Sequence, residues 1–544
     1  MENIKKIKFK VIICSFSFFI VYFGVAFSML TLSPEKREES KYSKKIVHNK
    51  SHIRGNIYDS NGFLIATTIR KYDLVINPSI LRSPENFYEQ LENIFHKEIN
   101  LSLKKKLYSK LKYLKIKKNI SQIEYKKVLE IGEPGINIEE NYIRKYPGKS
   151  LASHIIGKVD VDGKGISGLE FKLNNQLTDS QNVHLSIDSG IQNILKQLIL
   201  KQIRKFQADG GSGILMNAHN GKIRAIVSLP DYDNNINNNL SKEQIFNNAT
   251  KGTYELGSTL KIFTAAMAIE SGKFKDNDLI DVSAPIPLSK FQIIKDIKKI
   301  NFPINLPEII VHSSNIGTAK IANSLGHALQ NKYFELLGFN KKVNIEIVET
   351  ALPFINRELR PASLMSKSYG YGIRISPLHL AKATAIVLNG GKLVSPTLLN
   401  TQFQKTQYKQ IFSSETSRKI RSILYLVIND RNGTGKRAKS FYYPIGGKTG
   451  TANKLIDGRY SKTENIVAFT GGFPINKPQY VFTIVIDGPK PQKFSANRNT
   501  AGWVIAPMVG KLVDRISPIL KIAPLNLEPS EMGLKNYKIR GTTL

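Results

Sequence analysis

Apolar residues gather most densely near the start of the chain. Residues 11–30 contain no charged residue and consist largely of Phe, Ile and Val. A helix of twenty residues reaches about 30 Å, the thickness of a bilayer core. We therefore predict a single membrane-spanning anchor. The alternative is a cleaved signal peptide, whose apolar part is about 7–15 residues long and ends at small residues. Residues 33–50, which follow here, are instead highly charged.

Positive residues flank this segment on both sides. Four lysines precede it within residues 1–10, and six Lys and Arg residues follow it within residues 33–50. Because membrane topology usually places the richer positive flank inside the cell, an even distribution does not orient the helix. A long domain can also cross the membrane largely regardless of its flanking charge.

The next part of the chain has a mixed pattern. Arg54–Asp59 is strand-like and is followed by Asn61-Gly62, a strong hairpin-turn signal. Residues 83–130 carry apolar side chains at helical spacing among many lysines, which predicts helices. We expect residues 48–180 to form one extended, mostly non-catalytic module.

A second pattern begins near Val183. Ile191–Phe206 predicts an amphipathic helix. Two apolar runs, Gly213–Ala218 and Lys222–Ser228, are joined through Asn220-Gly221 and predict a β-hairpin. The Asn-rich residues 231–248 are expected to form an irregular loop.

Strand patterns return late in the chain. Ile466–Gly472 and Tyr480–Ile486 predict two strands joined by a Pro-containing turn. Pro507 suits the first turn of a last helix with one apolar face. With strands at both ends and helices between, this module fits an α/β domain whose terminal segments share one sheet.

The chain is strongly basic, with 79 Lys and Arg against 43 Asp and Glu and a net charge of +36. Such a charge can indicate a nucleic-acid partner. The lysines are spread along the whole chain, however, and no recognition-helix, zinc-finger or RNP pattern is present, so we expect no nucleic acid. A biased composition or a basic surface near anionic lipid or cell wall explains the charge. With one cysteine, Cys14, and no paired histidine pattern, we expect no disulfide, metal or cofactor.

Ser258 and Lys261 form the first candidate motif, S-x-x-K. On a helix this spacing lets the lysine amine reach the serine hydroxyl. Serine is a weak nucleophile until a base takes its proton, and lysine can be that base when burial or a nearby cation lowers its pKa. Gly257 permits close approach to the helix N-terminus, whose free N–H groups favour an oxyanion. The same spacing occurs elsewhere, but only Ser258 precedes an apolar run that predicts a buried helix; the other matches are Ser33–Lys36, Ser102–Lys105 and Ser109–Lys112.

Two further motifs follow in the chain. Ser313-Ser314-Asn315 has the S-x-N pattern, which also occurs by chance at residues 180–182 and 495–497. Lys448-Thr449-Gly450-Thr451 predicts an edge strand of small residues along which an extended peptide can lie. Its lysine supplies a cation for a carboxylate and its threonines supply hydrogen bonds.

Each pattern alone is common, but their order and their separations of 55 and 135 residues are informative. Together they match the motif set of penicillin-binding proteins and β-lactamases. The chain resembles class B penicillin-binding proteins, most closely the division-specific FtsI type, over nearly its whole length. Further stretches carry this resemblance: Arg54–Gly62, Arg144–Pro147, His154–Gly157, Gly165–Glu170, Tyr369–Ile373, Gly433–Lys436, Phe469–Pro474 and Ala501–Pro507. One departure is Leu256, where the family usually has Pro before Gly-Ser, and it concerns the stiffness of the loop.

The resemblance implies a multi-domain α/β architecture. A transpeptidase domain with a central antiparallel sheet flanked by helices would follow an extended α+β pedestal of the dimerisation type. The expected boundaries are a cytoplasmic tail at 1–10, the anchor at 11–30, linker and pedestal at 31–180, the transpeptidase domain at 181–525 and a polar tail at 526–544.

The resemblance also implies a peptidoglycan D,D-transpeptidase that β-lactams acylate. Ser258 would attack the D-Ala-D-Ala carbonyl, Lys261 would act as base, and Ser313 would relay the proton to the leaving amine. The amides of Ser258 and Thr451 would form the oxyanion hole. Asn315, Lys448, Thr449, Gly450 and Thr451 would bind the stem peptide and its carboxylate.

Partners and location follow from the same resemblance. We expect a single-pass protein of the bacterial inner membrane with a periplasmic catalytic domain, acting on lipid-linked nascent glycan. Residues 33–180 are too few for a glycosyltransferase domain, so a partner of the FtsW type, with other division proteins, would polymerise glycan. The alternatives are an elongation-type transpeptidase, a carboxypeptidase or β-lactam hydrolase, and a scaffold with a silent catalytic domain.

Overall fold

The computed structural model describes residues 15–27, 53–96, 99, 101–236, 239–288, 293–400 and 409–534. The chain separates into two compact units, Met1–His52 and Ile53–Leu544. In the first unit, residues 15–27 form a helix. Among the described residues, no helix has both the length and the apolar character needed to cross a membrane. The predicted anchor extends beyond the described helix at both ends and stays a prediction, and the tail at 1–10 lies outside the described residues.

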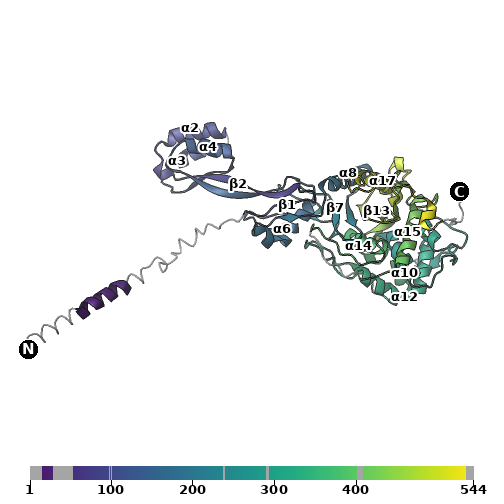
Figure 1. Cartoon of the computed structure of the whole chain (residues 1–544). Coiled ribbons are helices and arrows are strands. Elements are labelled where there is room, and N and C mark those ends of the chain that lie inside the picture. Colours follow the sequence, from purple (N-terminus) through teal and green to yellow (C-terminus); the bar gives the residue numbers. More distant parts are fainter. Residues whose placement is uncertain are drawn as a thin grey trace, which may run out of the picture. The chain divides into compact units, whose positions relative to one another are not determined.

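The second unit begins with the pedestal (Figure 1). Its long strand β2, Leu64–Ile76, pairs antiparallel with β4, Ile136–Lys145, and with β3, Leu114–Ile120. Short strand β1, Ile57–Tyr58, joins β2 to β5, Val183–His184. The predicted turn at Asn61-Gly62 connects β1 and β2, as the hairpin signal indicated.

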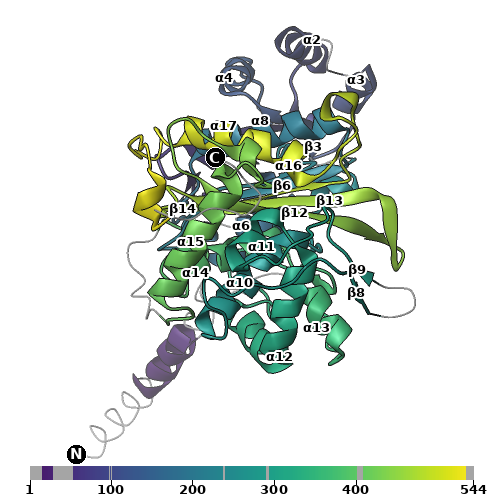
Figure 2. The same ribbon diagram turned by 90° about the vertical axis from the view of Figure 1, so that its right-hand side faces the viewer.

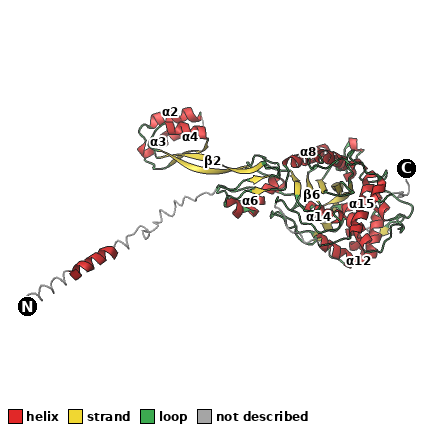
Figure 3. Cartoon of the chain, viewed as in Figure 1, coloured by secondary structure: helices red, strands yellow, loops and turns green. Residues whose placement is uncertain are grey.

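Three helices lie beside the outer half of β2 (Figure 3), and their bounds are Pro84–Phe95 (α2), Leu101–Leu107 (α3) and Gln122–Glu130 (α4). Leu74 and Ile76 of the sheet share a core with Phe87 and Leu91 of α2. The prediction of helices throughout residues 83–130 is wrong at β3. There the apolar residues alternate with lysines at period two, which is a strand pattern.

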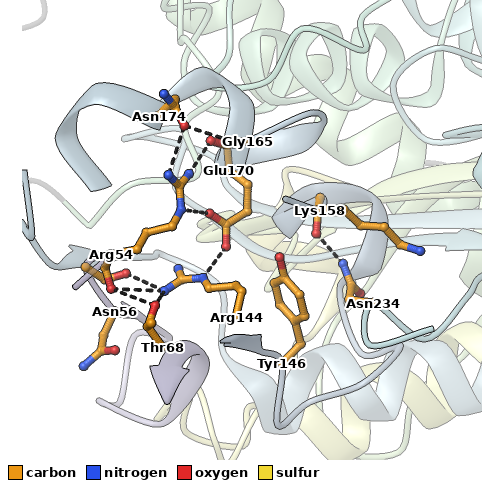
Figure 4. Close-up of polar contacts among 12 residues, drawn as sticks. Arg54, Asn56, Thr68, Arg144, Tyr146, Lys158, Gly165, Glu170, Asn174 and Asn234 are labelled. Atoms are coloured by element: carbon orange, nitrogen blue, oxygen red, sulfur yellow. Dashed lines mark hydrogen bonds and ion pairs between the residues drawn. The ribbon is translucent and has the colours of Figure 1, made fainter. Parts of the chain in front are cut away.

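The inner end of the pedestal is built around one carboxylate (Figure 4). Glu170 is fully buried and accepts hydrogen bonds from Arg54 Nε at 2.6 Å and Arg144 Nε at 2.7 Å. Arg54 also binds Asn174, and Arg144 binds the Gly55 carbonyl oxygen. Three sequence motifs from separate parts of the pedestal therefore meet at Glu170. The short helices here are α5 (Ser153–Ile156), α6 (Gly168–Lys172) and α7 (Asn174–Thr178).

The second domain of this unit is organised on a five-stranded antiparallel sheet with the order β12-β13-β14-β6-β7. The hairpin predicted at Asn220-Gly221 joins β6 to β7, and the two late strands predicted are β13 and β14. The two ends of the domain thus share one sheet, as expected. The strand bounds are Gly210–Asn217 (β6), Ile223–Leu229 (β7), Gly446–Ile456 (β12), Arg459–Phe473 (β13) and Tyr480–Asp487 (β14).

Helices cover both faces of this sheet (Figure 2). Alternate residues of β14 point to opposite sides. On one face, Phe482 and Ile484 share a core with α8 (Ser189–Phe206) and α17 (Ala506–Ile516). On the opposite face, which carries more helices, Val481 and Val485 belong to a second core. That face contains α10 (Lys261–Glu270), α11 (Leu306–His312), α12 (Asn315–Leu337), α13 (Pro361–Ser368), α14 (Pro377–Leu388) and α15 (Ser414–Asn429).

Smaller elements complete the domain: α9 (Lys242–Ile245), α16 (Ala501–Val504), β8 (Ile286–Pro287), β9 (Ile293–Ile294), β10 (Phe354–Ile355) and β11 (Ile373–Arg374). The prediction of an irregular loop at 231–248 is wrong at α9, where Ser241 and Gln244 form a capping box. In the polar tail, Met532 is buried and its carbonyl oxygen accepts from Ser422 on α15.

Candidate active site

Ser258 lies at the junction between a tight turn and a buried helix. It belongs to a 3₁₀ turn, Gly257–Leu260, and α10 begins at Lys261 rather than at the serine. Gly257 has φ +53, a left-handed conformation that glycine adopts without strain. The half-buried Ser258 side chain makes no hydrogen bond to another described residue, so its hydroxyl is available for reaction.

Lys261 is fully buried and points to the S-x-N motif. Its Nζ donates to the Ser313 carbonyl oxygen at 2.5 Å and to Asn315 Oδ1 at 2.7 Å, and it lies 3.3 Å from Ser313 Oγ. The first and second predicted motifs, from α10 and the α11–α12 junction, are therefore in direct contact.

Ser313 is held in an unusual backbone conformation between two helices. It ends α11 with φ 60 and ψ 42, in the left-handed region that non-glycine residues rarely adopt. Ser314 then caps α12, its side chain accepting from Gly317 N. This abrupt reversal places the Ser313 hydroxyl and the Asn315 amide beside Lys261. Backbone strain of this kind is concentrated at functional sites.

Lys448 brings the third motif to the same serine. It is fully buried, and its Nζ donates to Ser313 Oγ at 2.9 Å and to the Thr449 carbonyl oxygen at 3.1 Å. It lies on β12, which is the edge strand of the sheet, as predicted. Thr449 Oγ1 donates to Thr434 Oγ1 at 2.9 Å, and Thr451 Oγ1 accepts from the Ala501 amide at 3.2 Å.

The nucleophile segment packs directly on β12. A Cβ added to Gly450 would lie 2.2 Å from the Leu256 carbonyl oxygen, and one added to Gly257 would lie 2.7 Å from the Thr451 carbonyl oxygen. Only glycines at both positions allow this approach. Leu256, the departure from the family pattern, is buried within this contact.

The pKa values of Lys261 and Lys448 are both lowered. For Lys261 this is the direction that a catalytic base requires. Burial lowers the pKa of Lys261 well below its usual value, and the charge of Lys448 lowers it further, while Asp296 opposes the shift. Burial lowers the pKa of Lys448 to about 7. A neutral Lys261 can accept the serine proton, and a protonated Lys448 can bind a carboxylate.

Asp296 is a site residue that the sequence patterns do not indicate. Its Oδ1 accepts from the amides of Asn315 at 2.5 Å and Ile316 at 3.1 Å, and its Oδ2 accepts from Ser314 Oγ at 2.6 Å. It thereby caps α12 from outside the helix and fixes the S-x-N motif. Because it comes from the loop after β9, no local spacing connects it to Ser313. Among the described residues, no group of three or more His, Cys, Asp or Glu could hold a metal.

Comparisons with known proteins agree with this geometry. Residues 211–509 match the family model of the penicillin binding protein transpeptidase domain, and residues 50–197 match that of the penicillin-binding protein dimerisation domain. A probable peptidoglycan D,D-transpeptidase FtsI of Caulobacter vibrioides is 31% identical over 86% of this chain and 82% of its own. The peptidoglycan D,D-transpeptidase FtsI of Buchnera aphidicola is 28% identical over 95% of this chain and 96% of its own.

The fold is also found among solved structures. Penicillin-binding protein 3 of Mycobacterium tuberculosis, complexed with aztreonam, superposes with a TM-score of 0.70 at 20% identity, covering 88% of this chain and 98% of that one. The expected pedestal and α/β transpeptidase fold are thus confirmed. The chain belongs to the class B penicillin-binding proteins and is a serine acyltransferase of that family.

Proposed function

We propose that this enzyme is a peptidoglycan D,D-transpeptidase that cross-links stem peptides at the division septum, with Ser258 as nucleophile. One observation carries the proposal. Lys261, Ser313, Asn315 and Lys448 come from three separate motifs and form one hydrogen-bonded cluster. Ser258 lies in the 3₁₀ turn that leads directly into Lys261, so this cluster supplies a base and a carboxylate-binding cation close in the chain to the proposed nucleophile.

In the first half-reaction, neutral Lys261 takes the Ser258 proton as Oγ attacks the carbonyl between the two D-Ala residues. The negative charge that develops on the carbonyl oxygen is stabilised by the amides of Ser258 and Thr451. The C–N bond then breaks, Ser313 relays the proton to the leaving amine, and D-Ala departs. An ester to Ser258 remains.

Binding of the donor peptide rests on the edge strand. An extended peptide can pair with the outer edge of β12, as in other cases of strand addition. Its terminal carboxylate is bound by Lys448, Thr449 and Thr451, and its amide by Asn315. In the second half-reaction, an amine of a neighbouring strand attacks the ester, loses its proton to the Lys261 base, and releases Ser258.

The first prediction tests the nucleophile. Labelled penicillin should form a stable adduct with the wild type, and mass mapping should place it on Ser258. Ser258→Ala should abolish labelling because it removes the hydroxyl that attacks the β-lactam carbonyl, and Ser313, which is hydrogen-bonded to Lys448, should not replace it. Ser102→Ala, which removes a serine from a chance S-x-x-K match, is the control and should label fully. Equal labelling of wild type and Ser258→Ala would exclude the assignment.

What attacks the ester distinguishes the alternative functions. A carboxypeptidase or β-lactam hydrolase uses water, and a transpeptidase uses an amine. A defined stem peptide with an added acceptor amine should give a cross-linked product in excess of the hydrolysed one. Rapid turnover of a β-lactam would favour the hydrolase. Depletion of the protein distinguishes the two transpeptidase roles. Filamentous cells would indicate a role in division, and rounded cells would indicate a role in elongation.

We further propose a single-pass location in the inner membrane, with the catalytic domain in the periplasm and an FtsW-type glycosyltransferase as partner. The uncharged run at residues 11–30 supports the anchor, and the lack of a glycosyltransferase domain within 33–180 supports the partner. External protease should digest the catalytic domain in spheroplasts without lysis. Protection of the domain would contradict this location.

A further inference from the structure

A carboxylate lies in the segment that leads into the nucleophile. Glu255 is 7% exposed, and its Oε1 accepts from the Gly372 amide at 2.8 Å and from the Tyr460 hydroxyl at 3.1 Å. Its Oε2 is buried and has no hydrogen-bond partner among the described residues. A buried carboxylate with one unpaired oxygen costs folding free energy, so its presence requires an explanation other than stability.

The two donors to Glu255 come from two segments that border the nucleophile. Gly372 follows the turn at Tyr369–Gly370, and a Cβ on Gly370 would lie 2.2 Å from the Gly257 carbonyl oxygen. This turn therefore lies against the nucleophile segment on one side. Tyr460 lies on β13, just after the turn that connects it to β12. Glu255 joins all three segments through one oxygen.

A second contact holds the same part of the β12–β13 hairpin. The Asn453 amide donates to Tyr371 Oη at 3.3 Å, and the rings of Tyr371 and Tyr460 meet edge to face with centroids 5.4 Å apart. The strand pairing is irregular between Asn453 and Leu455. The outer hairpin, residues 453–460, is therefore attached to the rest of the domain by side chains at the point where its own ladder is interrupted.

We propose that Glu255 is a positioning residue that ties the outer hairpin to the nucleophile segment and so fixes the distance between Ser258 and the edge strand β12. The proposal rests on the proposed function, since β12 is where the donor peptide or a β-lactam would lie. A hydroxyl bound to a carboxylate makes a stronger bond than one bound to a neutral group. The burial of the Glu255 carboxylate costs folding free energy. Its presence is explained if its hydrogen bond from Tyr460 serves acylation.

A double-mutant cycle on the full-length protein in detergent tests the proposal, with labelled penicillin as the probe. Tyr460→Phe removes only the donor and should slow the second-order acylation rate constant about tenfold. Glu255→Ala should slow it further, because it also frees Gly372. Glu255→Gln should fall between Glu255→Ala and wild type, since an amide oxygen still accepts both bonds. Adding Tyr460→Phe to Glu255→Ala should cost nothing more.

The controls separate positioning from folding. Tyr442→Phe removes an exposed tyrosine hydroxyl elsewhere in the domain and should acylate at the wild-type rate. Tyr460→Phe takes one donor from a buried carboxylate and should lower the Tm somewhat, so all acylation rates are measured on the folded fraction well below that Tm. If Glu255→Ala does not fold, the same cycle is measured with Glu255→Gln, in which Tyr460→Phe should cost less than in wild type. The proposal would be overturned if Tyr460→Phe were acylated at the wild-type rate. It would also be overturned if the rate loss of the double variant were the product of the losses of the two single variants. A wild type that is not labelled at all would count against the proposed function instead.

Discussion

Two buried lysines share one serine hydroxyl at the centre of the site. Ser313 Oγ lies 3.3 Å from Lys261 Nζ and 2.9 Å from Lys448 Nζ. Both amines have lost the water that would stabilise their charged forms, and two ammonium groups at this separation also repel each other. Burial and a like charge therefore both favour the neutral form of Lys261, the proposed base. The negative charge of Asp296 opposes this lowering of the Lys261 pKa.

Asp296→Asn tests this balance. The aspartate charge raises the pKa of Lys261, so its removal should lower that pKa and keep Lys261 neutral at lower pH. The acid limb of the acylation rate should move to lower pH by about 0.5–1 unit. Asparagine can still accept from the amides of Asn315 and Ile316. Asp276→Asn, which affects an exposed ion pair, is the control, and an unmoved limb in Asp296→Asn would contradict the assignment.

Lys448→Met tests the cost of burying a cation. Folding lowers the pKa of Lys448 from 10.5 to about 7. Between these values the unfolded chain binds more protons than the folded one, so the folded state gains stability as pH rises. The unfolding free energy of wild type relative to Lys448→Met should therefore rise between about pH 7 and 10.5 and be flat below, as measured by urea titration. Exposed Lys110→Met should show no such trend.

At the scale of elements, the site depends on how closely the nucleophile segment approaches β12. Two glycines on opposite sides of the contact, Gly257 and Gly450, leave no space for a side chain. At this point the nucleophile segment and β12 meet backbone against backbone, and the contacts of Glu255 act on the same pair of elements from the outer hairpin.

Gly450→Ala should separate these two elements. The new Cβ would lie 2.2 Å from the Leu256 carbonyl oxygen, so strand or segment must move. We expect the unfolding free energy to fall by about 1–3 kcal/mol. We also expect the acylation rate of the folded fraction to fall well below that of the folded wild type. Gly148→Ala, whose Cβ would meet Leu151 at an ordinary 3.4 Å, should change neither. Acylation at the wild-type rate in Gly450→Ala would show that the contact does not position Ser258.

The elements show what could be predicted from sequence. The strands β6, β7, β13 and β14 followed from apolar runs and turn signals because both depend on neighbouring residues. The strand β3 was missed because its alternation is short and three of its seven residues are lysines. Asp296 and Glu255 were missed for a different reason. Their partners lie on other segments, so only the tertiary fold brings them to the site. The three motifs proposed to be catalytic could be recognised because each is compact in the sequence, although their contacts through Ser313 are not visible in the chain.

At the scale of the second unit, the pedestal has its own centre at Glu170. Arg54 and Arg144 are almost fully buried and both bind this carboxylate. Buried charges are stable only while they are paired, so removing the shared anion leaves two unpaired cations. None of these residues contacts the catalytic cluster, which makes the pedestal and the chemistry separable by mutation.

Glu170→Ala should therefore destabilise the protein without altering its chemistry. We expect a loss of about 3–5 kcal/mol in unfolding free energy, whereas the folded fraction should be acylated at the wild-type rate. Glu140→Ala, which breaks an exposed pair with Arg70, should have little effect on either. A reduced acylation rate in folded Glu170→Ala would instead show that the pedestal acts on the site. Thermal unfolding and penicillin labelling of the same samples give both values.

The sheet order has a consequence for synthesis of the chain. The β6–β7 hairpin ends at Leu229, but its neighbour β14 begins at Tyr480. At about 5–20 residues per second, the ribosome needs some tens of seconds to supply that partner, during which the hairpin has an open edge. Long-range closure of this kind is slow and exposes strands to aggregation. Lys448 lies on β12, which is joined to β6 and β7 only through β13 and β14, so we expect a chain that ends before β14 to lack a working catalytic centre.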